Sequence, residues 1–283
     1  MSEKAASPKS RFRIIVIIVI FLLLACFCLA LLGAGRNKTV ADRAYSWKTG
    51  SWIPGYLERW TVKSWVDDNC TVYIAENGEF QPYLVLTSNY GGNVLLLRKY
   101  LLPELMPFNK NERHLWSWSQ YGGYYEDSTI DKYLNTDFIN TLSQTTQDAI
   151  VNSDIVITDK SSMGSSVGAT KNISRKVFIL SLQEMQDGKN YASVHEGKTV
   201  SYFSDDYTRR VACLPNGEKH PCWTRTPSTW QTYIVNVIGS NGELSLGGAD
   251  ADIGVRPAFC LKNTTTIKQR TDIINGQTVY AIE

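Results

Sequence analysis

The chain has 283 residues, of which 43% are hydrophobic and 20% charged, so it can bury a substantial core and does not belong to the mainly disordered class. Its formal net charge of +2 gives no overall basic field of the kind that marks a nucleic-acid-binding protein, and we expect no nucleic acid among its partners. Ordinary glycine and proline contents exclude collagen-like and low-complexity classes.

The N-terminal segment indicates a membrane anchor. A basic stretch in residues 1–13 precedes an uncharged apolar run from Ile14 to Leu32. As a helix, such a run is long enough to cross the hydrocarbon core of a bilayer, and the positive-inside rule places the basic flank in the cytoplasm. We therefore predict a cytoplasmic tail over 1–13, a transmembrane helix over 14–35, and a single-pass cell-membrane protein whose C-terminal domain is extracellular.

Two alternatives to an uncleaved anchor remain open. Gly33-Ala34-Gly35 would serve as the exit of a cleaved signal peptide, although the apolar run is longer than such peptides use. Leu23 to Cys26 would serve as a lipobox, but the residues that follow stay apolar where a mature lipoprotein turns polar. After the anchor we expect a juxtamembrane connector over 36–69 and an extracellular domain over 70–283.

The cysteines agree with export to an oxidising compartment. Two of the six lie inside the apolar run, and the others follow it: Cys70, Cys213, Cys222 and Cys260. An even set in an exported domain predicts disulfides. Cys213 and Cys222 bracket a turn-rich loop that a disulfide would close, and Cys70 would then pair with Cys260. Four buried thiols that never pair are the alternative.

Strand signals begin at Cys70. Residues 70–75 are rich in strand formers, and Asn77-Gly78 predicts a hairpin turn directly after them. Further strands are predicted over residues 83–87 and 94–97, with a glycine-containing turn between them.

The middle of the chain changes to helical periodicity. Ser128 and Asp131 have the spacing of a capping box, and apolar residues then recur at helical intervals. This pattern predicts a helix over 129–142, to which residues 144–152 add another turn or two.

Two more strands follow, over residues 155–158 and 176–180, with a serine- and glycine-rich loop between them. Ser181 with Glu184 predicts the cap of a short helix that ends at Gly188.

The C-terminal third is mostly β. Its predicted strands cover residues 211–214, 223–226, 232–238, 255–261 and 278–282. Short strands combined with two or more short helices predict an α+β domain.

Five sequence blocks occur in an order that resembles a bacterial domain family of surface and secreted proteins whose activity is unassigned. They are Tyr83–Thr87, Ser128–Asn135, Arg175–Glu184, Trp223–Pro227 and Gly254–Ala258. The resemblance spans about residues 70–262. The last two blocks are also similar, more distantly, to the end of C-type-lectin-like domains of the formylglycine-generating-enzyme branch. That second resemblance implies a compact C-type-lectin-like domain with loops as its ligand surface.

Two arginines in the last two blocks are candidate ligand contacts. Arg225 and Arg256 each stand near a proline in a predicted strand. Their guanidinium groups could hold backbone carbonyls, a carboxylate such as Asp131 or Glu184, or a ligand. Internal polar networks are the commoner use of such arginines.

The densest group of aromatic residues is the other candidate ligand surface. Flat rings among small polar residues can stack on sugars, while the polar groups fix orientation, or they can pack beneath a loop. The candidates are Trp116, Trp118, Tyr121, Tyr124 and Tyr125.

A calcium site is one interpretation of the loop that begins at Gly247 and carries acidic residues at alternate positions. Oxygen ligands for Ca²⁺ could come from Asn241, Glu243, Asp250 and Asp252, although a solvated turn explains the same residues. We expect no other cofactor.

Binding is therefore favoured over catalysis. We expect a surface-interaction module whose ligand is a glycan, a cell-wall polymer or a protein, and we assign no catalytic residue. The alternatives are an extracytoplasmic enzyme of the formylglycine-generating type and a purely structural envelope module.

Overall fold

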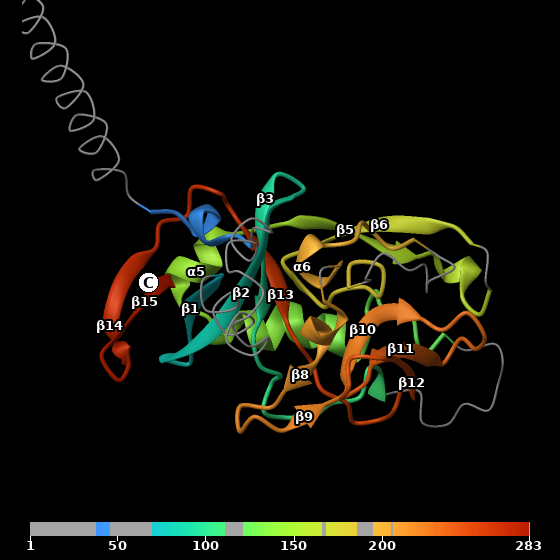
Figure 1. Cartoon of the computed structure of the whole chain (residues 1–283). Helices are drawn as coiled ribbons and strands as arrows, with labels where there is room; N and C mark the ends of the chain where they lie inside the picture. Colours follow the sequence, from blue (N-terminus) through green and yellow to red (C-terminus); the bar gives the residue numbers. More distant parts are fainter. Residues whose placement is uncertain are drawn as a thin grey trace, which may run out of the picture. The chain divides into compact units, whose positions relative to one another are not determined.

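The computed structural model describes residues 38–45, 70–110, 121–165, 168–185, 195–204 and 206–282. The chain divides into two units, Met1–Lys38 and Thr39–Glu283. Only Lys38 of the first unit is among the described residues, so the fold described is that of the second unit (Figure 1).

The predicted membrane anchor is not supported. Within the described part of the chain, no helix combines the length and the apolar character needed to cross a bilayer. The predicted tail over 1–13 and helix over 14–35 lie outside the described residues, as does most of the predicted connector over 36–69. We therefore correct the predicted single-pass membrane localisation, which rested on the apolar run, its length, its basic flank and the cysteines: the described structure contains no helix of the required length and apolar character.

A large curled sheet dominates the fold (Figure 1). The strand order is β14-β15-β1-β2-β3-β13-β4, and β7 also pairs with β13. The strands are β1 (Thr71–Glu76), β2 (Glu79–Tyr90), β3 (Asn93–Arg98), β4 (Ile150–Val151), β7 (Val177–Phe178), β13 (Ala258–Leu261), β14 (Lys268–Ile274) and β15 (Gln277–Ile282). Strand β1 pairs antiparallel with β2 on one side and parallel with β15 on the other.

Smaller β elements complete the described unit. The three-stranded sheet consists of β10 (Cys222–Pro227), β11 (Ile234–Ile238) and β12 (Leu244–Gly248). Two-stranded ribbons are formed by β5 (Ser153–Thr158) with β6 (Thr170–Arg175) and by β8 (Ala212–Cys213) with β9 (Lys219–His220).

The helices are short. They are α4 (Thr129–Tyr133), which continues as a π-helical turn (Leu134–Phe138) and a 3-10 turn (Ile139–Thr141), then α5 (Gln144–Ala149) and α6 (Ser201–Ser204). Further 3-10 turns cover Val40–Arg43, Lys160–Ser162 and Tyr207–Arg210.

Local sequence signals explain two of these elements. Asn77 (φ 49°) and Gly78 (φ 85°) both adopt the left-handed conformation that a two-residue hairpin needs, and they connect β1 to β2 as predicted. The hydroxyl of Ser128 accepts a hydrogen bond of 3.2 Å from the N–H of Asp131, so the predicted N-cap of α4 is confirmed.

The predicted α+β, C-type-lectin-like class is wrong. Among the residues that the structure describes, strands account for 42% and helices for 17%, so the described domain is mostly β. Strands β6, β12 and β14 escaped prediction because they are polar or glycine-rich and partly exposed, and therefore lack the apolar alternation that marks a half-buried strand. The predicted helix after Ser181 is a turn over the residues described there.

The core lies against the large sheet. In β2, β3 and β13, runs of consecutive apolar side chains are buried, because these strands lie inside the sheet with both faces covered. The fully buried members of these runs include Val85, Leu86, Val94, Leu95, Leu96, Phe259, Cys260 and Leu261.

The predicted disulfides are absent, since all of the described cysteines are free. In the sheet, β2 and β3 separate Cys70, beside β1, from Cys260 in β13, a separation far beyond disulfide reach. In the β8–β9 hairpin, Cys213 faces Lys219, whereas Cys222 faces Ile238 in another sheet. The turn-rich loop is thus closed by backbone pairing, and the oxidising-compartment argument loses its support.

Candidate functional site

Three loops come together around Thr232. The N–H of Gly123 donates a hydrogen bond of 2.8 Å to the carbonyl of Thr232, which joins the loop before α4 to the loop between β10 and β11. A Cβ added to Gly164 would lie 3.4 Å from Thr232 Cγ2, so the loop after β5 approaches the same residue. Chain segments that are far apart in sequence therefore form one continuous surface.

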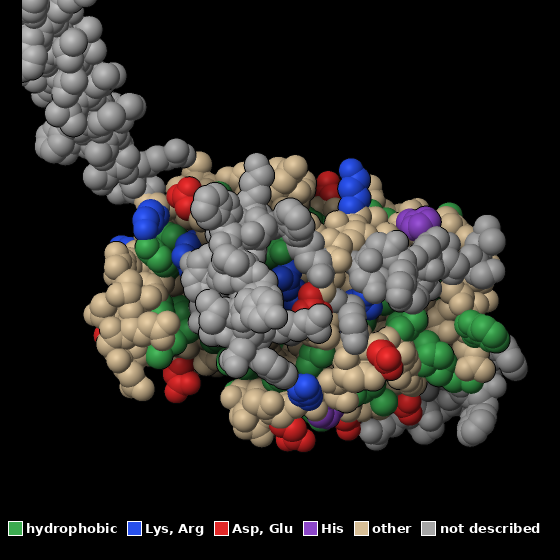
Figure 2. All heavy atoms as spheres, viewed as in Figure 1, with side chains coloured by type: hydrophobic (Ala, Val, Ile, Leu, Met, Phe, Trp, Pro, Cys, Tyr) green, Lys and Arg blue, Asp and Glu red, His purple; other side chains and the backbone are tan. Residues whose placement is uncertain are grey.

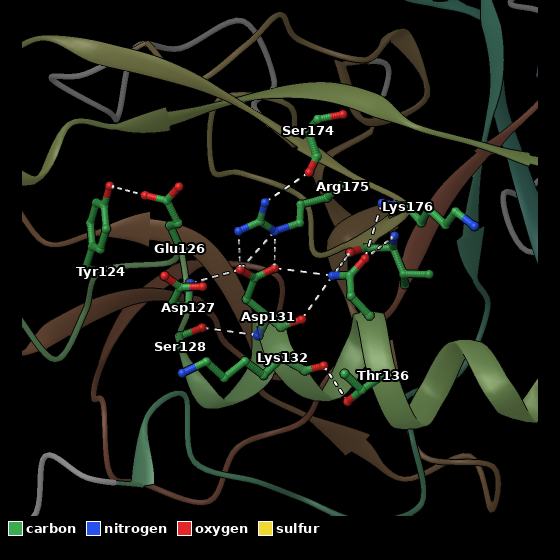
Figure 3. Close-up of polar contacts among 12 residues, drawn as sticks. Tyr124, Glu126, Asp127, Ser128, Asp131, Lys132, Thr136, Ser174, Arg175 and Lys176 are labelled. Carbon is green, nitrogen blue, oxygen red and sulfur yellow. Dashed lines mark hydrogen bonds and ion pairs between the residues drawn. The ribbon is translucent and has the colours of Figure 1, made fainter.

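A group of tyrosine, lysine and glutamate side chains occupies part of this surface. Lys160 Nζ lies 4.8 Å from the ring centroid of Tyr121 and 5.6 Å from that of Tyr124. Lys171, on β6, lies 5.9 Å from the Tyr124 ring and forms an ion pair with Glu126. The hydroxyl of Tyr124 donates a 2.9 Å hydrogen bond to Glu126 (Figure 3). We call these five residues the tyrosine–lysine cluster.

The charges in the cluster reinforce one another. The hydrogen bond from Lys171 lowers the pKa of Glu126, and the same bond raises the pKa of Lys171. Partial burial and the hydrogen bond to Glu126 raise the pKa of Tyr124, so its phenol stays protonated. The cluster thus places the ion pair of Lys171 and Glu126, together with Lys160, beside two phenol rings.

Large aromatic side chains near Thr232 are exposed. Tyr121 is 38% exposed, and Trp230, in the loop between β10 and β11, is 81% exposed. Figure 2 shows hydrophobic side chains gathered over β10–β12 on the face drawn. Single exposed apolar residues are ordinary, but two rings on loops that touch, bordered by charged groups, are typical of a ligand surface.

The predicted aromatic group is only partly brought together. Trp116 and Trp118 lie outside the described residues, so their part of the prediction has no structural outcome. Tyr121 and Tyr124 both belong to the tyrosine–lysine cluster. Tyr125 is 1% exposed and packs against Phe108, which makes it a core residue.

The two candidate arginines are buried and bind within the protein. Arg225 is fully buried and forms a bidentate pair with Glu184, with N···O distances of 2.7 and 2.8 Å. It also donates to the carbonyls of Val156 and Ile179. Arg256 is 6% exposed and donates to the carbonyl of Arg98. These contacts stabilise the fold and leave neither side chain accessible to a ligand.

The block from Ser128 to Asn135 also has a structural role (Figure 3). The carboxylate of Asp131 accepts bidentate hydrogen bonds of 2.8 and 2.9 Å from Arg175 and a third bond of 2.9 Å from the N–H of Asp127. Because Asp131 is on α4 and Arg175 ends β6, this ion pair attaches the helix to the ribbon.

The residues of the predicted calcium loop lie at the two ends of β12. Asn241 and Glu243 are hydrogen-bonded to each other in the turn before the strand, and Asp250 and Asp252 follow its other end. The full length of β12 therefore separates the two pairs. Across the described residues, no group of three His, Cys, Asp or Glu side chains is placed to hold a metal ion.

A second buried carboxylate lies beside the Arg225–Glu184 pair. Glu196 is fully buried and accepts hydrogen bonds from the N–H of Thr158 (2.6 Å), its hydroxyl (2.7 Å) and the hydroxyl of Thr226 (2.5 Å). Burial raises its pKa above the ordinary value of 4.5, while Arg225 and the hydroxyl donors oppose the rise. The buried guanidinium group of Arg225 thus forms an ion pair with Glu184 and also stabilises the carboxylate of Glu196 electrostatically.

We expect this carboxylate to make stability depend on pH. Because the pKa of Glu196 is higher in the folded than in the unfolded state, its contribution to the free energy of unfolding is fully present below about pH 4.5. That contribution is lost as the pH rises through the folded-state pKa. The loss is about 1.4 kcal/mol for each unit of pKa elevation. Urea unfolding of the wild type and of Glu196→Gln from pH 4 to pH 8 measures it. As the pH rises, the free energy of unfolding of the wild type should fall relative to that of Glu196→Gln. If the difference between the two proteins did not change with pH, or equalled that of the exposed control Glu218→Gln, the raised pKa of Glu196 would be contradicted.

Sequence reasoning missed several residues of this surface. Glu126, Lys160 and Lys171 carry no local pattern that links them, because only the pairing of β5 with β6 and the loop contacts bring them together. Trp230 had a usable signal, since a large aromatic residue in a polar loop between two predicted strands has no core position to fill.

Comparison with known proteins identifies the domain. No curated protein and no solved structure matches the chain. A family model described as "Domain of unknown function (DUF6273)" matches residues 91–263. The expectation of a domain family with unassigned activity is confirmed, whereas the motif assignments and the lectin likeness are not. With more than half of its length matched, this chain belongs to the DUF6273 family.

Proposed function

We propose that this protein is a glycan-binding module and that its ligand lies on the surface formed by the tyrosine–lysine cluster and Trp230. The observation that carries the proposal is the exposure of Tyr121 (38%) and Trp230 (81%) on loops joined through Gly123 and Thr232. A protein gains nothing in stability from an indole left in water, so such exposure favours a role in recognition.

The chemistry next to these rings suits a sugar. The C–H face of a pyranose packs on a flat aromatic ring, while its hydroxyl groups need hydrogen-bond partners at the edge. Lys160, Lys171 and Glu126 supply donors and an acceptor beside Tyr121 and Tyr124. Backbone hydrogen bonds hold the loops, so a ligand meets a largely preformed surface.

The polar residues of the sequence blocks favour binding over catalysis. Arg225, Glu184, Asp131 and Arg175 are all engaged in internal ion pairs. Their charged groups are thus paired within the fold, whereas the exposed charged groups are those of the cluster. A protein partner and a purely structural module remain as outcomes that a binding experiment separates from glycan recognition.

Tyr121→Ala and Trp230→Ala should each weaken glycan binding about tenfold or more, because each removes a stacking ring. Thermal shifts across a panel of oligosaccharides find the ligand, and calorimetry then compares the variants. Leu246→Ala is the matched control, since Leu246 is also exposed (57%) but lies on β12 outside the cluster. A wild-type protein that unfolds cooperatively and binds no member of the panel, or variants that bind as tightly as the wild type, would contradict the proposal.

A further inference from the structure

Lys160 is the member of the tyrosine–lysine cluster whose charge is not neutralised. Its ammonium group faces the rings of Tyr121 and Tyr124. Among the described residues no carboxylate forms an ion pair with it, whereas Lys171 is paired with Glu126. A lysine held over aromatic faces keeps its full charge and its hydrogen-bond donors.

The carboxylates near this lysine are already engaged. Asp159, its neighbour in sequence, accepts hydrogen bonds from the N–H (2.9 Å) and the hydroxyl (2.5 Å) of Ser161. Glu126 accepts from both Lys171 and Tyr124. Lys160 therefore offers a cation at an exposed position directly beside a ring that is itself partly exposed.

A ligand that covers Tyr121 would bring one edge of its sugar ring close to this ammonium group. A neutral sugar presents a hydroxyl there, which gains one ordinary hydrogen bond. A carboxylate at the same edge gains a charge-assisted hydrogen bond and meets a cation that has no competing ion pair. The surface therefore favours the charged ligand.

We propose that the sugar bound at this surface is acidic and carries its carboxylate against Lys160, as a hexuronic acid would. The inference rests on the proposed glycan-binding function and adds the class of sugar to it. The same geometry gives the residues separate roles: Tyr121 and Trp230 bind the ring faces, and Lys160 selects the charge.

The test uses the full chain and compares polygalacturonic acid with its methyl ester, in which esterification removes the charge of the carboxyl group. The wild type should bind the acid about tenfold more tightly than the ester. Lys160→Met should bind both about equally, because it keeps the apolar stem and removes the ammonium group. Tyr121→Ala should weaken binding of both polymers.

Each other outcome is decisive. If the wild type binds acid and ester equally, glycan binding stands and the charge selection is overturned. If it binds neither polymer nor any neutral sugar of the panel, the proposed function fails and this inference with it. The control is Lys219→Met, an exposed lysine on β9 outside the cluster. An equal loss of acid binding in this control would show general electrostatic attraction and overturn the role of Lys160.

Discussion

Replacing Arg225 with methionine is expected to lower the free energy of unfolding by about 3–5 kcal/mol, the typical cost of removing one partner of a buried ion pair. Glu184 and Glu196 would then remain in the interior without a cation, and the carbonyls of Val156 and Ile179 would lose their donor. Since whole domains are stable by only about 5–15 kcal/mol, this loss would remove a large share of the free energy of unfolding. Urea unfolding followed by tryptophan fluorescence measures the change.

Two further variants show whether the loss comes from the unpaired charge. Arg225→Met combined with Glu184→Met should recover part of the stability, because an apolar pair replaces the ion pair and only the other donors are missed. Arg270→Met removes an ion pair with Asp272 at the surface and should leave the unfolding midpoint nearly unchanged. If Arg225→Met unfolded at the same urea concentration as the wild type, the buried pair would have no part in stability.

A polypeptide limited to the family match, residues 91–263, is expected not to fold. It lacks β1, β2, β14 and β15, so β3 loses its hydrogen-bonded neighbour β2. It also loses core side chains that are 0–2% exposed, namely Val72, Ile74, Tyr83, Leu84, Val85, Leu86 and Ile282. Burial of each side chain contributes roughly 1.5–3 kcal/mol, so their combined contribution is comparable to or larger than the whole stability of an ordinary domain.

The control polypeptide is residues 38–283, which keeps every strand of the large sheet. It should show a cooperative thermal transition and dispersed amide resonances, while residues 91–263 should show neither and should aggregate through the exposed edge of β3. Cooperative unfolding of the shorter polypeptide at a similar temperature would mean that the flanking strands are accessories to a core that is complete without them.

The strands that could be predicted from the sequence are those whose own residues carry the burial pattern. Residues 70–75 and 94–97 are rich in apolar side chains because most of these side chains are buried in the core. The turn was predictable because its two positions need positive φ angles, which Asn77 and Gly78 adopt readily. Strand β14, with Lys268, Arg270 and Asp272, forms an exposed edge where charge protects against further pairing, so its composition hides its structure.

The candidate site was predictable only in part. The ring residues Tyr121 and Tyr124 stood out because they are close in sequence. Lys160 and Lys171 reach those rings only through the β5–β6 ribbon, and no local pattern in a single sequence reports such a contact. For Arg225 the sequence left two uses open, a ligand contact and an internal pair with a carboxylate such as Glu184. In the structure Arg225 is a core residue paired with Glu184.

The parallel pairing of β1 with β15 has a consequence for synthesis of the protein. These strands lie near the two ends of the described chain, and Tyr73 and Ile74 are matched with Ala281 and Ile282. On the ribosome, β1 emerges early, but its edge that pairs with β15 stays without hydrogen-bond partners until β15 has left the exit tunnel. The large sheet is thus completed only after β15 has been synthesised, which predicts slow folding and a need for chaperone protection of the early strands.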